Sequence, residues 1–233
     1  MKIGAIVQAR MSSQRFPGKV LYRVGGKPIL QYLLERIRRC HSLDTVVVAT
    51  SVEESDVPIV DFCKEQRVIY YQGSLFDVAG RFKAVLDRFR LDAFVRVTGD
   101  SPLLDPKLID KAVGLFLRDN FDMVTNLLPR TYPKGQSVEV FSAKVFKTTY
   151  ERMQGRGMLE HVSKYFYENK QSFKIYNFEA ERNYEDIQLS VDTAEDMERF
   201  SRILSAMKKP HWQYGLGDLL EILKRMSLST KEA

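Results

Sequence analysis

The chain has 233 residues, of which 44% are hydrophobic, so it is long enough to bury a substantial core within one large domain. No apolar run approaches the roughly 18 residues of a membrane span, and no signal-peptide pattern precedes the first apolar stretch, so we expect a cytoplasmic protein without a membrane partner. The net charge is +6, but the basic residues are interleaved with 30 acidic ones, which argues against a nucleic-acid partner. The two cysteines, Cys40 and Cys63, lack the paired spacing of a zinc site or a disulfide framework.

Short apolar strands alternate with amphipathic helices over the first half of the chain. Helical patterns begin at Pro28 and Asp56, run from about 76 to 89, and include 108–116. Strands are expected at 2–8, 45–50, 68–71, 93–98 and 122–126. Repeated β-α-β units of this length predict a Rossmann-like three-layer α/β/α sandwich with a mostly parallel sheet.

The pattern changes after Leu127, where Pro129, Pro133 and Gly135 interrupt the chain. The alternating residues 137–141 are interpreted as a strand in an excursion from the edge of the sheet. The remaining elements expected are helices at 144–153 and 158–168, strands at 173–178 and 188–191, and a helix that Thr193 and Asp196 begin as a capping box. We predict a single domain over residues 1–226, with 127–180 as the excursion and 227–233 as a disordered tail.

A polar loop follows the first strand and carries three cations, Arg10, Arg15 and Lys19, together with small residues. Ligands of open α/β sheets bind beyond the carboxyl ends of the strands, so this loop lies where a ligand is expected. Backbone amides, guanidinium forks and an ammonium suit phosphate, although a solvated basic loop is the alternative. Neither a P-loop pattern nor a dinucleotide-binding Gly-x-Gly-x-x-Gly is present, which argues against those two enzyme classes.

Two carboxylates, Asp100 and Asp192, each follow a predicted strand. Two carboxylates that meet at one edge of a sheet suit a Mg²⁺ ion, which accepts one or two of them and keeps several waters. The ordinary alternatives are that Asp100 caps a turn and that Asp192 supports a helix start. Their occurrence together with the basic loop favours a metal–triphosphate site.

The order of motifs along the chain resembles that of a known family. The string Gln-Ala-Arg-Met-Ser-Ser-x-Arg-x-Pro-Gly-Lys-Val-Leu from Gln8, followed by Gly-Gly-Lys-Pro-Ile-Leu, resembles the opening signature of the cytidylyltransferases that make CMP-sugars. Within that group it is most similar to the spore-coat-polysaccharide SpsF-like branch, related to CMP-N-acylneuraminate and CMP-KDO synthetases. Further matching strings occur in order at 48–51, 72–74, 96–102, 132–135, 139–141, 160–162 and 191–196, so the resemblance covers about the first 200 residues.

The resemblance implies an enzyme that transfers CMP from CTP to an acidic, 2-keto-3-deoxy or sialic-acid-like sugar and releases pyrophosphate, for surface polysaccharide or glycoconjugate synthesis. It assigns Mg²⁺ to Asp100 and Asp192, and catalytic roles to Arg10, Lys19 and Asp100. A sugar hydroxyl attacks the α-phosphorus of CTP, and no protein nucleophile is required. The nucleotide-binding residues it implies are Gln8, Ala9, Arg10, Ser12, Ser13, Arg15, Lys19, Thr50, Ser51, Gln72, Gly73, Ser74 and Arg81.

The resemblance also suggests where the acceptor binds, and it implies a homodimer. The residues assigned to the acceptor are Arg130, Tyr132, Lys134, Glu139, Glu160 and His161. Lys134 or Arg130 is expected to pair with a sugar carboxylate and Glu139 to accept hydroxyl hydrogens, the alternative being an exposed loop and an edge strand. Leu159 departs from the family pattern, in which an arginine commonly precedes Glu-His-Val, and a structural role for His161 stays open.

Three other functions remain compatible with these residues. A nucleotidyltransferase acting on a sugar phosphate or alcohol phosphate would share the fold and the basic loop. A glycosyltransferase is less favoured, because its usual Asp-x-Asp metal motif is absent. A non-catalytic nucleotide-binding partner protein is the candidate from another class. The choice of CTP over other nucleotides depends on the resemblance alone.

Overall fold

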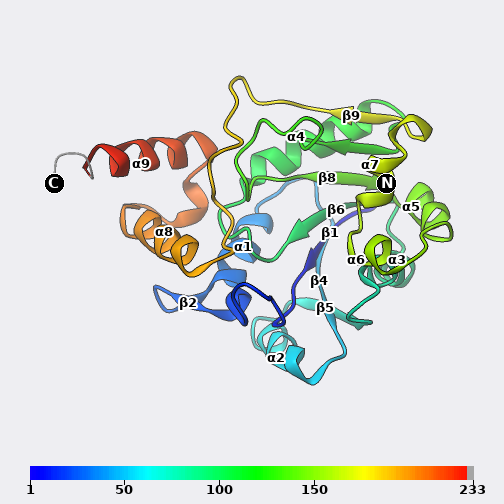
Figure 1. Ribbon diagram of the computed structural model, residues 1–233, viewed down its shortest axis with the longest axis horizontal. Coiled ribbons are helices and arrows are strands. Elements are labelled where there is room, and N and C mark those ends of the chain that lie inside the picture. The colour runs from blue at the N-terminus through cyan, green and yellow to red at the C-terminus, as the bar shows by residue number, and fades with distance from the viewer. Residues whose placement is uncertain (230–233) are drawn as a thin grey trace.

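The computed structural model describes residues 1–229 and is built around one large sheet (Figure 1). The order of its seven strands is β5-β4-β1-β6-β8-β7-β9. All neighbouring pairs are parallel except the two that involve β8. The strands are β1 (Ile3–Gln8), β4 (Thr45–Ser51), β5 (Ile69–Gly73), β6 (Ala93–Thr98), β7 (Met123–Thr125), β8 (Glu139–Ser142) and β9 (Ile175–Asn177), while β2 (Arg23–Val24) and β3 (Lys27–Pro28) form a separate small hairpin.

Helices cover both faces of the sheet because the central strands are apolar on both sides. Within β1, Ala5 and Val7 pack on one face and Ile6 on the other. The first face is covered by α1 (Ile29–Ile37), α2 (Val57–Glu65) and α4 (Pro106–Arg118), and the second by α3 (Val78–Phe89), α5 (Ala143–Tyr150) and α7 (Lys164–Glu168). The predicted three-layer α/β/α sandwich is therefore confirmed.

Among residues 1–229 the last two helices, α8 (Ala194–Ser205) and α9 (Leu216–Ser229), pack beside α1. The capping box predicted for α8 is present: Asp196 N–H donates to the Thr193 hydroxyl, and Asp196 accepts from the Thr193 N–H. The buried guanidinium of Arg36 on α1 donates to backbone carbonyls of Leu104, His211 and Tyr214, which fixes the segment before α9. Its burial lowers the pKa of Arg36 to about 10.

Three sequence expectations about the second half of the chain are wrong. Strand β8 is not an edge excursion, since it lies between β6 and β7 with Val140 and Phe141 buried on opposite faces. Residues 188–191 form no strand; Lys134 and Gln188 make only an isolated bridge, and the apolar alternation reflects packing of Leu189 and Val191 against the terminal helices. The helix expected at 158–168 is two short ones, α6 (Arg156–Glu160) and α7.

The C-terminal boundary also differs from the sequence expectation. Helix α9 was not predicted, and it continues to Ser229, so residues 227–229 are helical instead of belonging to a disordered tail. Residues 230–233 lie outside the described residues. No helix among residues 1–229 is long and apolar enough to cross a membrane.

A close backbone contact at Gly135 joins the loop after β7 to the segment that leads to Asp192. Gly135 has φ +90°, and a Cβ built there would lie 2.4 Å from Ser190 N and 2.6 Å from the Leu189 carbonyl carbon. We expect Gly135→Ala to lower the free energy of unfolding by about 2 kcal/mol or more, because both the backbone conformation and the contact are strained. Urea denaturation measures this difference.

Gly114→Ala provides the matched control. Gly114 lies in α4, and a Cβ there meets nothing within 4 Å. This variant should be stabilised by about 0.4–1 kcal/mol. Equal effects of the two substitutions would show that the Gly135 contact is not strained.

Candidate active site

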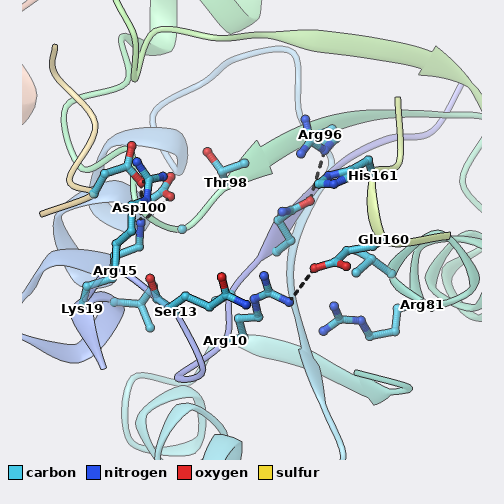
Figure 2. Close-up of a pocket in the computed structure, with 17 residues that line it drawn as sticks. Arg10, Ser13, Arg15, Lys19, Arg81, Arg96, Thr98, Asp100, Glu160 and His161 are labelled. Atoms are coloured by element: carbon cyan, nitrogen blue, oxygen red, sulfur yellow. Dashed lines mark hydrogen bonds and ion pairs between the residues drawn. The ribbon is translucent and has the colours of Figure 1, made fainter. Parts of the chain in front are cut away.

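A cavity of about 760 Å³ opens beyond the carboxyl ends of β1 and β6 (Figure 2). This is the position predicted for a ligand from the sheet topology. Its lining comes from the loop after β1, from β6, from α3 and from the segment around α6. The lining residues are Gln8, Ala9, Arg10, Ser13, Gln14, Arg15, Lys19, Val20, Val78, Arg81, Arg96, Thr98, Gly99, Asp100, Glu160, His161 and Asp192.

The loop after β1 is held by hydrogen bonds to a buried carboxylate, Asp56. Met11 N–H donates to Asp56 Oδ1 at 2.7 Å, and Oδ2 accepts from Ser51 N at 3.1 Å and Ser51 Oγ at 2.5 Å. Within the loop, the Met11 carbonyl accepts from both Ser13 N and Gly18 N. Asp56 thus links this loop, which is expected to bind phosphate, to the end of β4. The sequence interpretation missed this role, because Asp56 was read only as the start of a helix.

Lys19 lies at the centre of the acidic end of the cavity. Its side chain is 8% exposed, and Nζ donates to Asp100 Oδ2 at 2.8 Å, Asp192 Oδ1 at 2.9 Å and the Val191 carbonyl at 2.8 Å. Asp192 also accepts from Arg15 at 2.8 Å. The structure therefore brings together Asp100 and Asp192, which are far apart in the chain, and the three acceptors occupy all donors of the ammonium.

The two carboxylates fit the requirements of a Mg²⁺ ion. Both face the same ammonium, and their side chains stay 26% and 21% exposed on the cavity side. Within the part of the chain that the structure describes, the remaining oxygens have only long contacts, 3.4 Å from Ser101 Oγ to Asp100 Oδ1 and 3.4 Å from Gln188 Nε2 to Asp192 Oδ2. One or two carboxylates with open oxygens, together with water, are a normal donor set for this ion.

Arg10 and Arg81 also line the cavity, and they differ in their partners. Arg10 forms an ion pair with Glu160 of α6, with 3.2 Å between Nη1 and Oε1. Arg81 of α3 is buried; its Nη1 lies 3.5 Å from the Ala49 carbonyl, and its Nε has no hydrogen-bond partner among residues 1–229. Burial lowers the pKa of Arg81 to about 10, and the charge of Asp56 opposes that shift.

Six of the predicted nucleotide-binding residues do not line the cavity: Ser12, Thr50, Ser51, Gln72, Gly73 and Ser74. Thr50 and Ser51 are fully buried, and Ser12 is exposed on the loop. The Ser74 hydroxyl accepts from the N–H groups of Phe76 and Asp77 before α3. Gly73 leaves space for the Arg81 side chain, because a Cβ at residue 73 would lie 2.6 Å from Arg81 Cγ. The other predicted members of the set do line the cavity.

The predicted acceptor residues divide into two groups. Glu160 and His161 line the cavity, whereas Arg130, Tyr132, Lys134 and Glu139 do not. Tyr132 packs against Phe178, Arg130 donates to Ser137 Oγ, and Lys134 is exposed. Arg156 does not fill the place of the family arginine at Leu159, since its guanidinium stacks on the Phe76 ring at 4.4 Å.

Glu139 is a buried residue of the central strand β8. It is ion-paired with Arg96 and accepts from the Tyr167 hydroxyl at 2.6 Å. Glu139 was assigned to the acceptor site because β8 was taken as an edge strand. The carboxylate is instead buried inside the sheet and paired with an arginine. Arg96 and Thr98, which line the cavity, were absent from the predicted site. Arg96, Thr98 and Asp100 are two residues apart, so an extended chain places them on one face. This spacing was the sequence signal that could have identified Arg96 and Thr98.

Comparison with known proteins identifies the family. The sequence model of the cytidylyltransferase family matches residues 4–224. The chain belongs to this family. A solved cytidylyltransferase from Leptospira borgpetersenii serovar Hardjo-bovis superposes with a TM-score of 0.93 at 31% identity, covering 97% of this chain and 95% of that one.

Two curated relatives extend the comparison. The spore coat polysaccharide biosynthesis protein SpsF of Bacillus subtilis is 30% identical over 233 residues, covering 94% of this cytidylyltransferase and 93% of SpsF. The 3-deoxy-manno-octulosonate cytidylyltransferase of Pelobacter propionicus is 37% identical over 124 residues, which cover 51% of this chain and 46% of that enzyme. The resemblance found from the ordered motifs is confirmed, and the protein is a nucleotidyltransferase enzyme.

The hydrogen bonds of Asp56 predict a kinetic effect at a distance from the cavity. Asp56→Ala removes the acceptor of Met11 N–H, so the loop after β1 loses its link to β4. We expect the KM for the nucleotide to rise about tenfold, the scale of one lost charge-assisted hydrogen bond. Steady-state pyrophosphate release at varied nucleotide concentration measures it.

Asp61→Ala on α2 is the control, because Asp61 is exposed and pairs only with Lys64 among the described residues. Its nucleotide KM should match that of the wild type. A normal nucleotide KM in a folded Asp56→Ala protein would contradict the role of Asp56 in holding the loop.

Proposed function

We propose that this enzyme transfers CMP from CTP to an acidic sugar of the 2-keto-3-deoxy or sialic-acid-like class, releasing pyrophosphate, for surface polysaccharide or glycoconjugate synthesis. The observation that carries the proposal is the convergence of Lys19, Asp100 and Asp192 at the end of a basic loop in the main cavity. The name of the 3-deoxy-manno-octulosonate cytidylyltransferase relative supports the substrate class, and the name of SpsF supports polysaccharide synthesis.

The cations of the loop after β1 suit a triphosphate. Arg10, Arg15 and Lys19 all line the cavity; the arginines offer guanidinium forks to phosphate oxygens, and Lys19, whose donors are engaged by its three acceptors, adds positive charge beside them. A sugar hydroxyl oxygen bonds to the α-phosphorus while the bond between the α-phosphorus and the oxygen that bridges to the β-phosphorus breaks. Pyrophosphate leaves with that oxygen, and the hydroxyl proton passes to solvent water. Positively charged side chains stabilise the charge that grows on the leaving group.

We propose Asp100 and Asp192 as the ligands of Mg²⁺. When bound, this ion supplies charge neutralisation at the phosphate oxygens. The ion pairs made by Lys19 with the same two carboxylates support this assignment, because they keep both charges directed to one point before substrate arrives. The protein's own contribution is alignment of the triphosphate and the acceptor.

We assign the nucleoside to the side of the cavity formed by Arg81. The Nε of this buried arginine has no partner among the described residues, and Ala49 at the end of β4 lies beside its Nη1. Glu160 and His161 remain the candidates for contacts with sugar hydroxyl groups. The homodimer is also part of the proposal, and light scattering of the purified protein tests it.

Pyrophosphate release with each of the four nucleoside triphosphates, Mg²⁺ and a panel of acceptors tests the proposed function. The panel contains 3-deoxy-manno-octulosonate, N-acetylneuraminate and several sugar phosphates. Release with CTP and a sugar acid is the expected result. Release only with a phosphorylated acceptor would identify a sugar phosphate nucleotidyltransferase, and binding of CTP without any release would favour a non-catalytic partner protein.

A further inference from the structure

Arg96 is a cation of the cavity that stands apart from the others. Arg10, Arg15 and Lys19 belong to the loop after β1, and Arg81 belongs to α3 on the β4 side of the sheet. Arg96 comes from β6, the neighbour of β1 on the opposite side. Figure 2 shows its guanidinium well away from the Lys19 cluster, at the end of the cavity where His161 also lies.

The guanidinium of Arg96 is held through two of its three nitrogens. Its Nε donates to Gln8 Oε1 at 3.1 Å, and its Nη1 donates to Glu139 Oε2. Glu139 is in turn fixed by the Tyr167 hydroxyl at 2.6 Å, and the Thr125 hydroxyl lies 3.0 Å from the same tyrosine oxygen. Burial and the charge of Glu139 raise the pKa of Tyr167, so its phenol stays protonated and continues to donate.

Both N–H groups of Nη2 and one N–H of Nη1 are available to a ligand. An arginine has five N–H donors, and the bonds to Gln8 and Glu139 use two of them. No further hydrogen bond from Arg96 is found within residues 1–229, although its side chain is 19% exposed and lines the cavity. A planar fork held in place in this way matches the two oxygens of a carboxylate.

The charge near Arg96 favours a singly charged anion. Glu139 already balances one unit of positive charge there, whereas the strongly basic loop lies at the other end of the cavity. Thr98 follows two residues later on the same face of β6 and adds a hydroxyl to this part of the lining. A sugar acid with hydroxyl groups near its carboxylate matches this combination better than a phosphate dianion.

We propose that Arg96 binds the carboxylate of the acceptor sugar, and that Glu139 and Tyr167 are positioning residues that orient it. The inference rests on the proposed function and gives it a specific recognition contact. It replaces Arg130 and Lys134, which the sequence suggested for the carboxylate and which do not line the cavity.

Four variants distinguish binding of an anion by Arg96 from a role of Arg96 limited to neutralising the Glu139 carboxylate. Arg96→Gln should raise the KM for the acceptor about 10- to 100-fold and leave the KM for CTP within twofold, since a charge-assisted bond to the acceptor is lost. Arg96→Lys keeps the charge without the fork and should be intermediate. Glu139→Gln leaves the arginine in place but loosens it, so its acceptor KM should rise less than that of Arg96→Gln. Arg88→Gln, on the exposed surface of α3, is the matched control.

The double variant Arg96→Gln/Glu139→Gln decides between the two roles. It removes both charges and leaves no unpaired buried carboxylate, so a purely structural arginine predicts a return to the wild-type acceptor KM. We expect the acceptor KM to remain raised about 10- to 100-fold. Restoration of the wild-type KM, or a rise in the Arg130→Gln variant in place of Arg96→Gln, would overturn the proposal.

Equilibrium binding keeps this test independent of turnover. Calorimetric titration of the wild type with 3-deoxy-manno-octulosonate or N-acetylneuraminate, and with the carboxamide of each acid, should show binding of the acid alone, lost in Arg96→Gln. Such binding without pyrophosphate release would refute the proposed catalysis and support the contact. Turnover of a sugar acid with a normal acceptor KM in Arg96→Gln would leave the function standing and refute the contact. Equal binding of acid and carboxamide, or binding of sugar phosphates only, also refutes it.

Discussion

Lys19→Met is expected to reduce kcat about a thousandfold, the largest single effect predicted for this enzyme. The ammonium of Lys19 is nearly buried and is bonded to Asp100, Asp192 and the Val191 carbonyl. Methionine matches the length of the side chain but removes the charge that opposes two carboxylates and stabilises the leaving pyrophosphate. Pyrophosphate release at saturating CTP and acceptor measures the loss.

Lys64→Met is the control for this substitution. Lys64 lies on α2, and its side chain is 60% exposed beside Asp61. Its activity should equal that of the wild type, because exposed ion pairs contribute little. Circular dichroism of Lys19→Met establishes that the protein is folded. A folded Lys19→Met protein with more than a tenth of the wild-type kcat would remove Lys19 from the catalytic group.

Asp100→Asn and Asp192→Asn are expected to lower kcat by about a hundredfold or more each, with little change in thermal stability. Asparagine keeps the shape and one carbonyl oxygen but removes the negative charge proposed to hold Mg²⁺. The Mg²⁺ concentration for half-maximal activity should therefore rise in both variants. Lys19→Met should not raise this concentration, which distinguishes the loss of a metal ligand from the loss of the lysine.

Asp61→Asn serves as the neutral comparison, since Asp61 is exposed on α2 far along the chain from both carboxylates. Activity, Mg²⁺ dependence and melting temperature are measured on all three proteins. Retention of most activity and an unchanged Mg²⁺ requirement in both cavity variants would exclude the proposed metal site.

Local sequence patterns were sufficient for most of the parallel half of the fold. Residues 93–98 were predicted as a strand with the bounds that β6 has, and the helix patterns around 28–37 and 76–89 correspond to α1 and α3. These elements are strongly periodic and buried on defined faces, so composition and spacing carry the information. Helix α9 was missed although Leu219, Ile222, Leu223 and Met226 have helical spacing. Its boundary, unlike that of α8, is not marked by a capping box.

Local sequence patterns did not predict how segments in the second half of the chain pair and pack. β8 has only four residues, and nothing in its alternation distinguishes an edge strand from one inserted between β6 and β7. Residues 188–191 show a strand-like alternation because Leu189 and Val191 are buried, although they pair with no strand. Burial produces the same pattern whether or not a hydrogen-bonded ladder is present.

Residue types and their spacing along the chain identify the chemical groups of the site and the end of the sheet where they lie. The loop from Gln8 to Lys19, Asp100 and Asp192 all follow buried segments that end at this edge, and the motif order indicated the family. The hydrogen-bond partners of these groups depend on how the whole chain folds. The ammonium of Lys19 meets carboxylates 81 and 173 positions away, and Arg96 is oriented by Glu139 from a strand that runs antiparallel to its own. Such contacts depend on strand order and register, which are fixed by packing across the whole sheet and not by any local pattern.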